Sequence, residues 1–159
     1  MHQIVTEIDI AASPERVWSI LMDFPAYLQW NPFIRSLSGV AKPGERLHAT
    51  IQPEERSAMT FRPRVLKAAN QQELRWLGHL GSPGLFDGEY YFQLTALSNG
   101  HTRFTQGERF SGILVGVFIS RMEATTKGRF YAMNQALKDR AEANDHIGHA
   151  QDDISKDRY

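Results

Sequence analysis

Apolar and polar residues alternate in the first patterned segment of the chain. Ile4, Thr6, Ile8 and Ile10 share one face, and the residues between them, mostly acidic, form the other. A period of two is typical of a half-buried β-strand. We therefore predict a strand over residues 3–10 with one face toward a core.

Two short helices are predicted after this strand. Ser13 can cap a helix that begins at Pro14, because a serine oxygen accepts a bond from a free N–H group and proline fits the first turn. Pro25 ends this helix, since proline pushes the residue before it to extended geometry. A second short helix is predicted over residues 27–30, and Pro32 ends it in the same way.

Residues 34–110 carry the signals of six further strands. Turn-forming sequences such as Pro43-Gly44 separate runs that have a period of two. One run extends from Met59 to Val65, with Pro63 as an edge position or a bulge. Strands joined by short turns predict an antiparallel meander rather than βαβ units.

The apolar period changes after Gly112. Apolar side chains recur every three or four residues from Phe118 to Leu137, which predicts a helix of roughly 25–30 residues with one apolar stripe. Charged residues, Arg129 among them, are expected on its other faces. Residues 144–159 are polar and should fray. We therefore predict one domain over residues 1–143 and a polar tail over 144–159.

These faces predict how the elements pack. The sheet has one apolar face and the last helix one apolar stripe, so the sheet should curl around the helix. A curved sheet and a single helix do not always fill the space between them, which predicts an apolar cavity. The expected fold is α+β: a curved seven-stranded antiparallel sheet around a long C-terminal helix, with two short helices after the first strand.

Composition excludes several classes of function. The 159 residues include 18 Lys+Arg and 18 Asp+Glu, so the net charge is zero. Nucleic-acid recognition usually needs an excess of basic residues, and no such partner is expected. Cysteine is absent, which excludes disulfides, thiolate metal sites and a cysteine nucleophile. The longest apolar stretch, residues 113–119, is far shorter than the ~20 residues of a membrane span, so we expect a soluble cytoplasmic protein without membrane insertion.

Histidines give no metal site in this prediction. His146 and His149 are three residues apart, a spacing that can bind a metal on a helix, but they lie in the polar tail. His79 has the parity of the outer sheet face, so we do not expect it to be catalytic. No metal and no cofactor is predicted.

Two parts of the chain resemble a known superfamily. One comprises Ile10 to Trp18 and Tyr27 to Ile34, and the other comprises Gly88 to Phe92 and Thr102 to Gly112. They are similar to START-related (SRPBCC) helix-grip proteins, and most of all to the small bacterial polyketide cyclase/dehydrase-like group. The resemblance extends over most of the chain and implies a helix-grip fold.

This resemblance does not imply a single function. The superfamily includes lipid carriers, hormone receptors, aromatase/cyclases and hydroxylase subunits, and a fold does not determine function. Similar sequences often have histidine where this chain has Tyr90. A proton-transfer role of that histidine is therefore in doubt here, because tyrosine titrates near ~10 rather than ~6.5.

Strand parity and the helix stripe predict the walls of the cavity. Residues of one parity on each strand should point inward, together with the helix stripe and the segment after the second short helix. We expect the ligand to contact Trp30, Phe33, Trp76, Leu80, Phe86, Tyr90, Phe92, Phe104, Gln106, Glu108, Phe110, Phe118, Met122 and Phe130. The alternative is a solid core without a cavity.

Glu108 and Tyr90 are the catalytic candidates. A carboxyl group without a partner in an apolar cavity holds its proton tightly and can act as a general acid. The alternative for Glu108 is a structural role, paired with an arginine or with backbone N–H groups. Tyr90 and Gln106 could orient a ligand oxygen, or they could satisfy one another or a buried water.

The favoured function is non-catalytic binding of a small hydrophobic molecule, a lipid or a polyketide-like compound. The scarcity of titratable groups in the cavity favours binding over catalysis. A polyketide cyclase/dehydratase-like enzyme that uses Glu108 and Tyr90 for proton transfer is the alternative, and a ligand-free accessory protein is the third. The sequence leaves ligand identity and oligomeric state open, including a homodimer.

Overall fold

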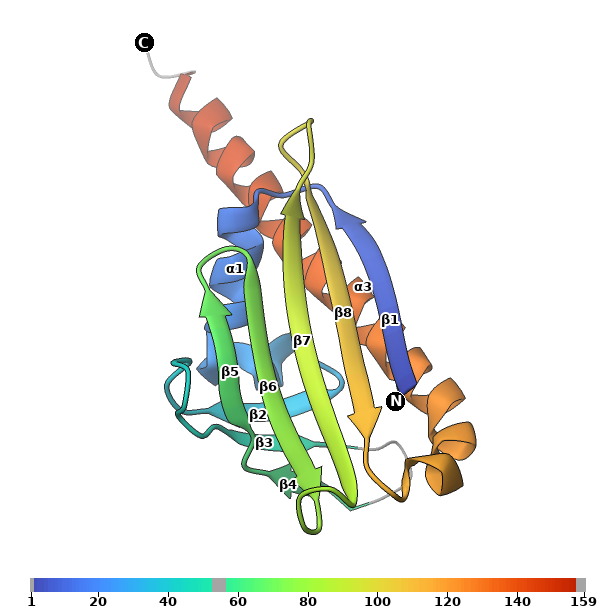
Figure 1. Cartoon of the computed structure of the whole chain (residues 1–159). Helices are drawn as coiled ribbons and strands as arrows, with labels where there is room; N and C mark the ends of the chain where they lie inside the picture. Colours follow the sequence, from blue (N-terminus) through green and yellow to red (C-terminus); the bar gives the residue numbers. More distant parts are fainter. Residues whose placement is uncertain (1, 53–56, 157–159) are drawn as a thin grey trace.

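The computed structural model describes residues 2–52 and 57–156, with side chains through residue 143. Strands form most of the chain before the final helix (Figure 1). The elements are β1 (His2–Ile10), α1 (Pro14–Met22), the 3-10 helix η1 (Phe24–Ala26), α2 (Tyr27–Trp30), β2 (Ile34–Ser38), β3 (His48–Ile51), β4 (Met59–Phe61), β5 (Arg64–Ala69), β6 (Glu73–Leu80), β7 (Phe86–Ala96), β8 (Thr102–Ser111) and α3 (Val115–Lys156).

The strands form two antiparallel sheets. The large sheet has the order β1-β8-β7-β6-β5, and the small sheet has the order β2-β3-β4. In Figure 1 the long strands of the large sheet run side by side, α3 crosses behind them, and the small sheet lies across one end. The predicted α+β class, with an antiparallel sheet and a long C-terminal helix, is confirmed.

The number of strands differs from the prediction because of Pro63. We expected seven strands in one sheet, but the described residues form eight strands in two sheets. The run from Met59 to Val65 divides into β4 and β5, since proline has no N–H to continue a ladder. β4 pairs with β3, whereas β5 pairs with β6.

The two short helices begin as expected, but the first ends differently: α1 stops at Met22, and Phe24 and Pro25 form the 3-10 helix η1 instead of an extended segment. The Ser13 side chain accepts a hydrogen bond from the Arg16 backbone N–H at 3.2 Å and caps α1. The helix α2 ends before Asn31, whose ψ of 112° is extended. The Asn31 Oδ1 atom accepts bonds from the N–H groups of Phe33 at 2.9 Å and Ile34 at 2.8 Å. This turn fixes the position of Phe33.

Helix α3 is longer than predicted. It spans 42 residues, because the polar segment that follows the apolar stripe continues the helix. Residues 157–159, and the side chains from residue 144 onward, including His146 and His149, lie outside the described part. No helix in the described part is both long and apolar enough to cross a bilayer.

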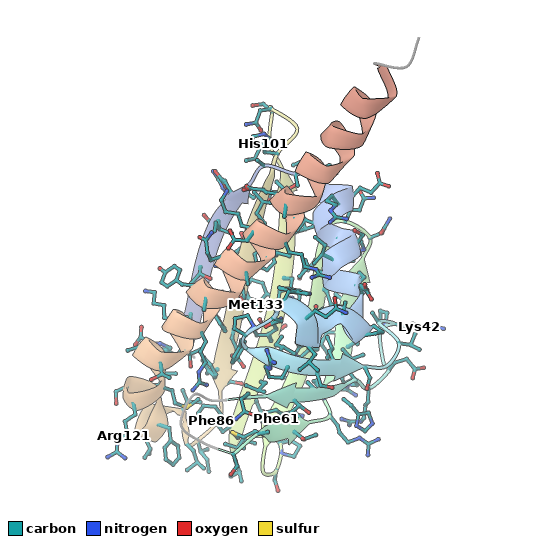
Figure 2. All side chains as sticks on the ribbon, turned by 180° about the vertical axis from the view of Figure 1, so that it is seen from behind. Lys42, Phe61, Phe86, His101, Arg121 and Met133 are labelled. Atoms are coloured by element: carbon teal, nitrogen blue, oxygen red, sulfur yellow. The ribbon has the colours of Figure 1, made fainter. Side chains whose placement is uncertain are left out.

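Strand β1 holds α3 against the large sheet through polar contacts. Asn134 Nδ2 donates to Thr6 Oγ1 at 2.9 Å, and Lys138 Nζ donates to the Asp9 carbonyl at 2.9 Å. The packed core lies between this helix and the sheet, where Met133 is labelled in Figure 2. Its fully buried side chains include Phe92, Phe104, Phe130, Met133 and Leu137.

Candidate functional site

A cavity of about 170 Å³ lies at one end of the molecule, between the two sheets and the first half of α3. Figure 2 looks onto the face crossed by α3, and the labelled Phe61 and Phe86 mark this end. Strand β4 contributes Phe61 and strand β7 contributes Phe86. The small sheet therefore forms the wall that faces the inner side of the large sheet.

Many residues expected around a ligand do line this cavity. They come from the start of β2, from β6, β7 and β8, and from α3. The expected residues that line it are Phe33, Trp76, Leu80, Phe86, Tyr90, Glu108, Phe110 and Met122. The expected residues that do not line it are Trp30, Phe92, Phe104, Gln106, Phe118 and Phe130.

Tight packing explains why most of these residues do not line the cavity. Phe92, Phe104, Gln106 and Phe130 have no exposed surface, because their side chains fill the interior beyond the cavity. The Phe118 side chain is 43% exposed on α3. Trp30 and Tyr27 instead pack edge to face, with ring centroids 5.2 Å apart. The interior is therefore solid in one part and hollow in another.

Tyr90 forms a wall of the cavity, and its hydroxyl group already has partners. Its ring stacks on Trp76 with centroids 4.9 Å apart. Its oxygen accepts a bond from Gln106 Nε2 at 2.6 Å, and its O–H group donates to Met133 Sδ at 3.7 Å. Burial, followed by the nearby charge of Glu108, raises the pKa of Tyr90 well above its usual value. Tyr90 and Gln106 are thus hydrogen-bonded to one another, although Gln106 Oε1 is buried without a partner in the described part of the chain.

Glu108 is the carboxyl group of the cavity. It makes no hydrogen bond or ion pair with any described residue. A Cβ atom at Gly88, on the neighbouring strand, would collide with its carboxylate, so this glycine makes room for the side chain. Glu108 keeps part of its surface accessible, but desolvation by the surrounding protein raises the pKa of Glu108 to about 8, so the protonated form predominates at neutral pH. The unpaired reading of Glu108 fits this geometry better than the structural one.

Arg129 also lines the cavity, although it was expected on another face of the helix. It lies three residues after Thr126 and seven after Met122, both of which line the cavity. That spacing is the signal that could have found it, because residues three, four and seven apart share one helix face. The Arg129 Nε atom is buried and has no hydrogen-bond partner in the described part of the chain.

His79 borders the cavity as well, although it was expected on the outer face. The lining includes Gly78 and Gly88, which pair on adjacent strands and carry no side chains. The cavity therefore reaches the backbone beside His79. The imidazole Nδ1 lies 2.7 Å from Asp87 Oδ1, and this hydrogen bond is the main reason why the pKa of Asp87 is lowered.

A second cavity, which we call the outer cavity, has a volume of about 470 Å³ and adjoins the first, which we call the inner cavity. Phe33 and Arg129 border both cavities. Small residues of α3, Ala124, Gly128 and Ala132, line the outer cavity. The described residues contain no cluster of three or more His, Cys, Asp or Glu side chains that could hold a metal ion.

Residues 1–142 match the sequence profile of a family described as polyketide cyclase/dehydrase and lipid transport. The chain matches no curated protein. This family match covers all the residues that line the two cavities.

Several solved structures share the fold. A START superfamily protein from Mycobacterium smegmatis is 21% identical, with a TM-score of 0.69 over 90% of this chain and 99% of that one. An aromatase/cyclase from Streptomyces sp. R1128 is 14% identical, with a TM-score of 0.70 over 89% and 93% of the two chains. A protein from Thermus thermophilus is 15% identical, with a TM-score of 0.70 over 90% and 99%. At these identities the likeness shows a common fold.

Proposed function

The chain belongs to the polyketide cyclase/dehydrase and lipid transport family, and on this premise we propose that its inner cavity binds a small, largely apolar molecule without transforming it. The observation that carries this proposal is an unfilled volume of about 170 Å³ with predominantly apolar walls. Aromatic side chains such as Trp76, Phe86 and Phe110 supply much of the contact area.

The size of the cavity limits the size of the ligand. Apolar cavities of ~150 Å³ in proteins bind benzene, so a cavity of about 170 Å³ suits a single ring or a short chain. A ligand with several fused rings would also need the outer cavity, which adjoins the inner one at Phe33 and Arg129. The body of the ligand is therefore the size of one substituted ring.

Gly78→Val tests this proposal by filling the cavity. Gly78 lines the cavity, and a Cβ atom there would meet only Pro63, at an ordinary contact distance of 3.8 Å. We expect the variant to fold, since valine suits a strand, and to bind toluene and butylbenzene at least about tenfold more weakly. Isothermal titration and ligand-observed NMR would measure both affinities.

Thr95→Val is the matched control, because it introduces the same side chain at an exposed position of β7. It should leave both affinities unchanged. A wild-type protein that binds neither hydrocarbon, or a Gly78→Val variant that binds them as tightly as the wild type, would contradict the proposal.

A cyclase/dehydratase-like activity is the second candidate, and Glu108 favours it. A protonated, unpaired carboxyl group can donate a proton to a carbonyl or hydroxyl oxygen. Tyr90 is a poor second proton carrier, since its hydroxyl is occupied by Gln106 and Met133. If this candidate holds, Glu108→Gln will abolish turnover and preserve ligand affinity.

A further inference from the structure

Arg129 has the geometry of a ligand-binding cation. It projects from α3 at the boundary between the inner cavity and the outer one. Its Nε atom is buried, and no described residue offers it a hydrogen bond or an ion pair. A buried donor without an acceptor is costly. An acceptor supplied by a ligand would remove this cost.

The other polar groups of the cavity do not supply that acceptor. Glu108 lies more than 4.0 Å from the guanidinium nitrogens, since no ion pair joins the two residues. Its carboxyl group is neutral at pH 7, so it neither neutralises Arg129 nor repels an incoming anion. Thr126 is buried one turn before Arg129 and makes no hydrogen bond with a described residue. Arg129 and Thr126 therefore present donors on one face of the helix.

We propose that the natural ligand is a small carboxylic acid, whose carboxylate binds Arg129 and Thr126 while its aromatic or short aliphatic body fills the inner cavity. This inference rests on the proposed function, because it names the class of molecule that the same cavity binds. A guanidinium group matches a carboxylate through two parallel N–H···O bonds. The head group then lies at the boundary with the outer cavity, and the apolar body lies inside.

The charge balance favours a carboxylate over a phosphate. Among the described cavity walls Arg129 is the single arginine, and no lysine lines them. One guanidinium group balances a singly charged carboxylate. A phosphate group carries up to two charges, so part of its charge would stay uncompensated in a largely apolar space.

The test compares 3-phenylpropanoate with 3-phenylpropan-1-ol, which has the same carbon skeleton but no charge. Calorimetric titration at pH 7 should show that the wild-type protein binds the acid at least about tenfold more tightly, as is usual for a charge-assisted hydrogen bond. Arg129→Met should lose at least about tenfold in affinity for the acid and keep its affinity for the alcohol within about twofold. Arg129→Lys keeps the positive charge but lacks the two parallel N–H donors of the guanidinium group, so it should recover part of the affinity for the acid that Arg129→Met loses.

Arg121→Met serves as the control, because Arg121 is an exposed arginine on the same helix and lines neither cavity. It should bind both probes like the wild type. If the wild type binds the acid and the alcohol with equal affinity, the inference is overturned and the proposed function stands. The same holds if Arg129→Met loses affinity for the acid and for the alcohol to the same extent. If the wild type binds neither these probes nor toluene, the proposed function falls as well.

Discussion

At the scale of single residues, Glu108 has an unusual place for a carboxyl group. Most buried carboxylates have a partner that lowers their pKa, as Glu73 does with Arg75 and Lys67. Glu108 has no such partner in the described part, and burial alone raises its pKa to about 8. In its neutral form this group can donate a hydrogen bond into the cavity.

Glu108→Gln should remove a pH dependence of stability. The ordinary pKa of glutamate, 4.5, applies to the unfolded chain, whereas the folded value is about 8. Between these values the unfolded chain has lost a proton that the folded protein still holds. The wild type therefore loses free energy of unfolding as pH rises from 4.5 toward 8, by at most about 1.4 kcal/mol per pH unit. The Gln variant lacks this pH dependence, so its free energy of unfolding should rise relative to that of the wild type between pH 4.5 and pH 8.

Urea unfolding at pH 3, 4, 5, 6, 7 and 8 would measure this difference. Glu142→Gln is a control of opposite sign, because hydrogen bonds from Lys138 and from the Ala11 backbone lower the pKa of Glu142. This variant should be less stable than the wild type at neutral pH, and the deficit should vanish as pH falls below the folded pKa. A difference between Glu108→Gln and wild type that stays constant with pH would mean that Glu108 is ionised in the folded protein.

At the scale of elements, α3 joins the core to the cavity. Phe130 has no exposed surface and packs edge to face against Phe33 and Tyr90, with centroids 5.8 Å and 5.6 Å away. It lies outside the cavity lining, so it serves as a core residue that positions two residues of the wall. The helix therefore links the packing of the core to the shape of the binding site.

Phe130→Ala should cost about 3–5 kcal/mol of the free energy of unfolding, as is usual for a fully buried ring. Denaturant unfolding measures this loss. Tyr131→Ala is the control on the same helix, since that side chain is 53% exposed, and it should change stability by less than about 0.5 kcal/mol. A loss below about 1 kcal/mol at Phe130 would show that its ring borders an open space instead of packed core.

Local patterns predicted the elements well, for reasons visible in individual residues. Ser13 and Pro14 begin α1 as expected, because a cap depends only on the nearest backbone groups. Pro63 was recognised as an irregular position, but whether a strand bends there or divides between two sheets depends on distant partners. The length of α3 was underestimated, because the apolar stripe marks only the part that is packed against the sheet.

At the scale of the whole molecule, the site was harder to predict than the fold. Parity indicates that Phe92 and Phe104 point inward, but it does not tell whether they line a hollow or fill it. That outcome depends on where the small sheet crosses the large one (Figure 1). A single arginine on an amphipathic helix resembles a solvated residue, and only its position beside residues from other elements places Arg129 at the cavity.

The junction between the two sheets at Pro63 determines which part of the cavity wall can change to accept ligands of another size. Main-chain bonds tie the small sheet to β5 near Gly44 and Leu47, which donate to the Val65 and Pro63 carbonyls at 2.9 Å. Ile51 and Met59, at the end of the small sheet away from these bonds, line the cavity and pair with each other. The small sheet is therefore tied to the large sheet at one end only, near Pro63. Substitutions at the other end of the small sheet would change the volume of the cavity through side-chain packing alone. The hydrogen-bond ladder of the large sheet would stay intact.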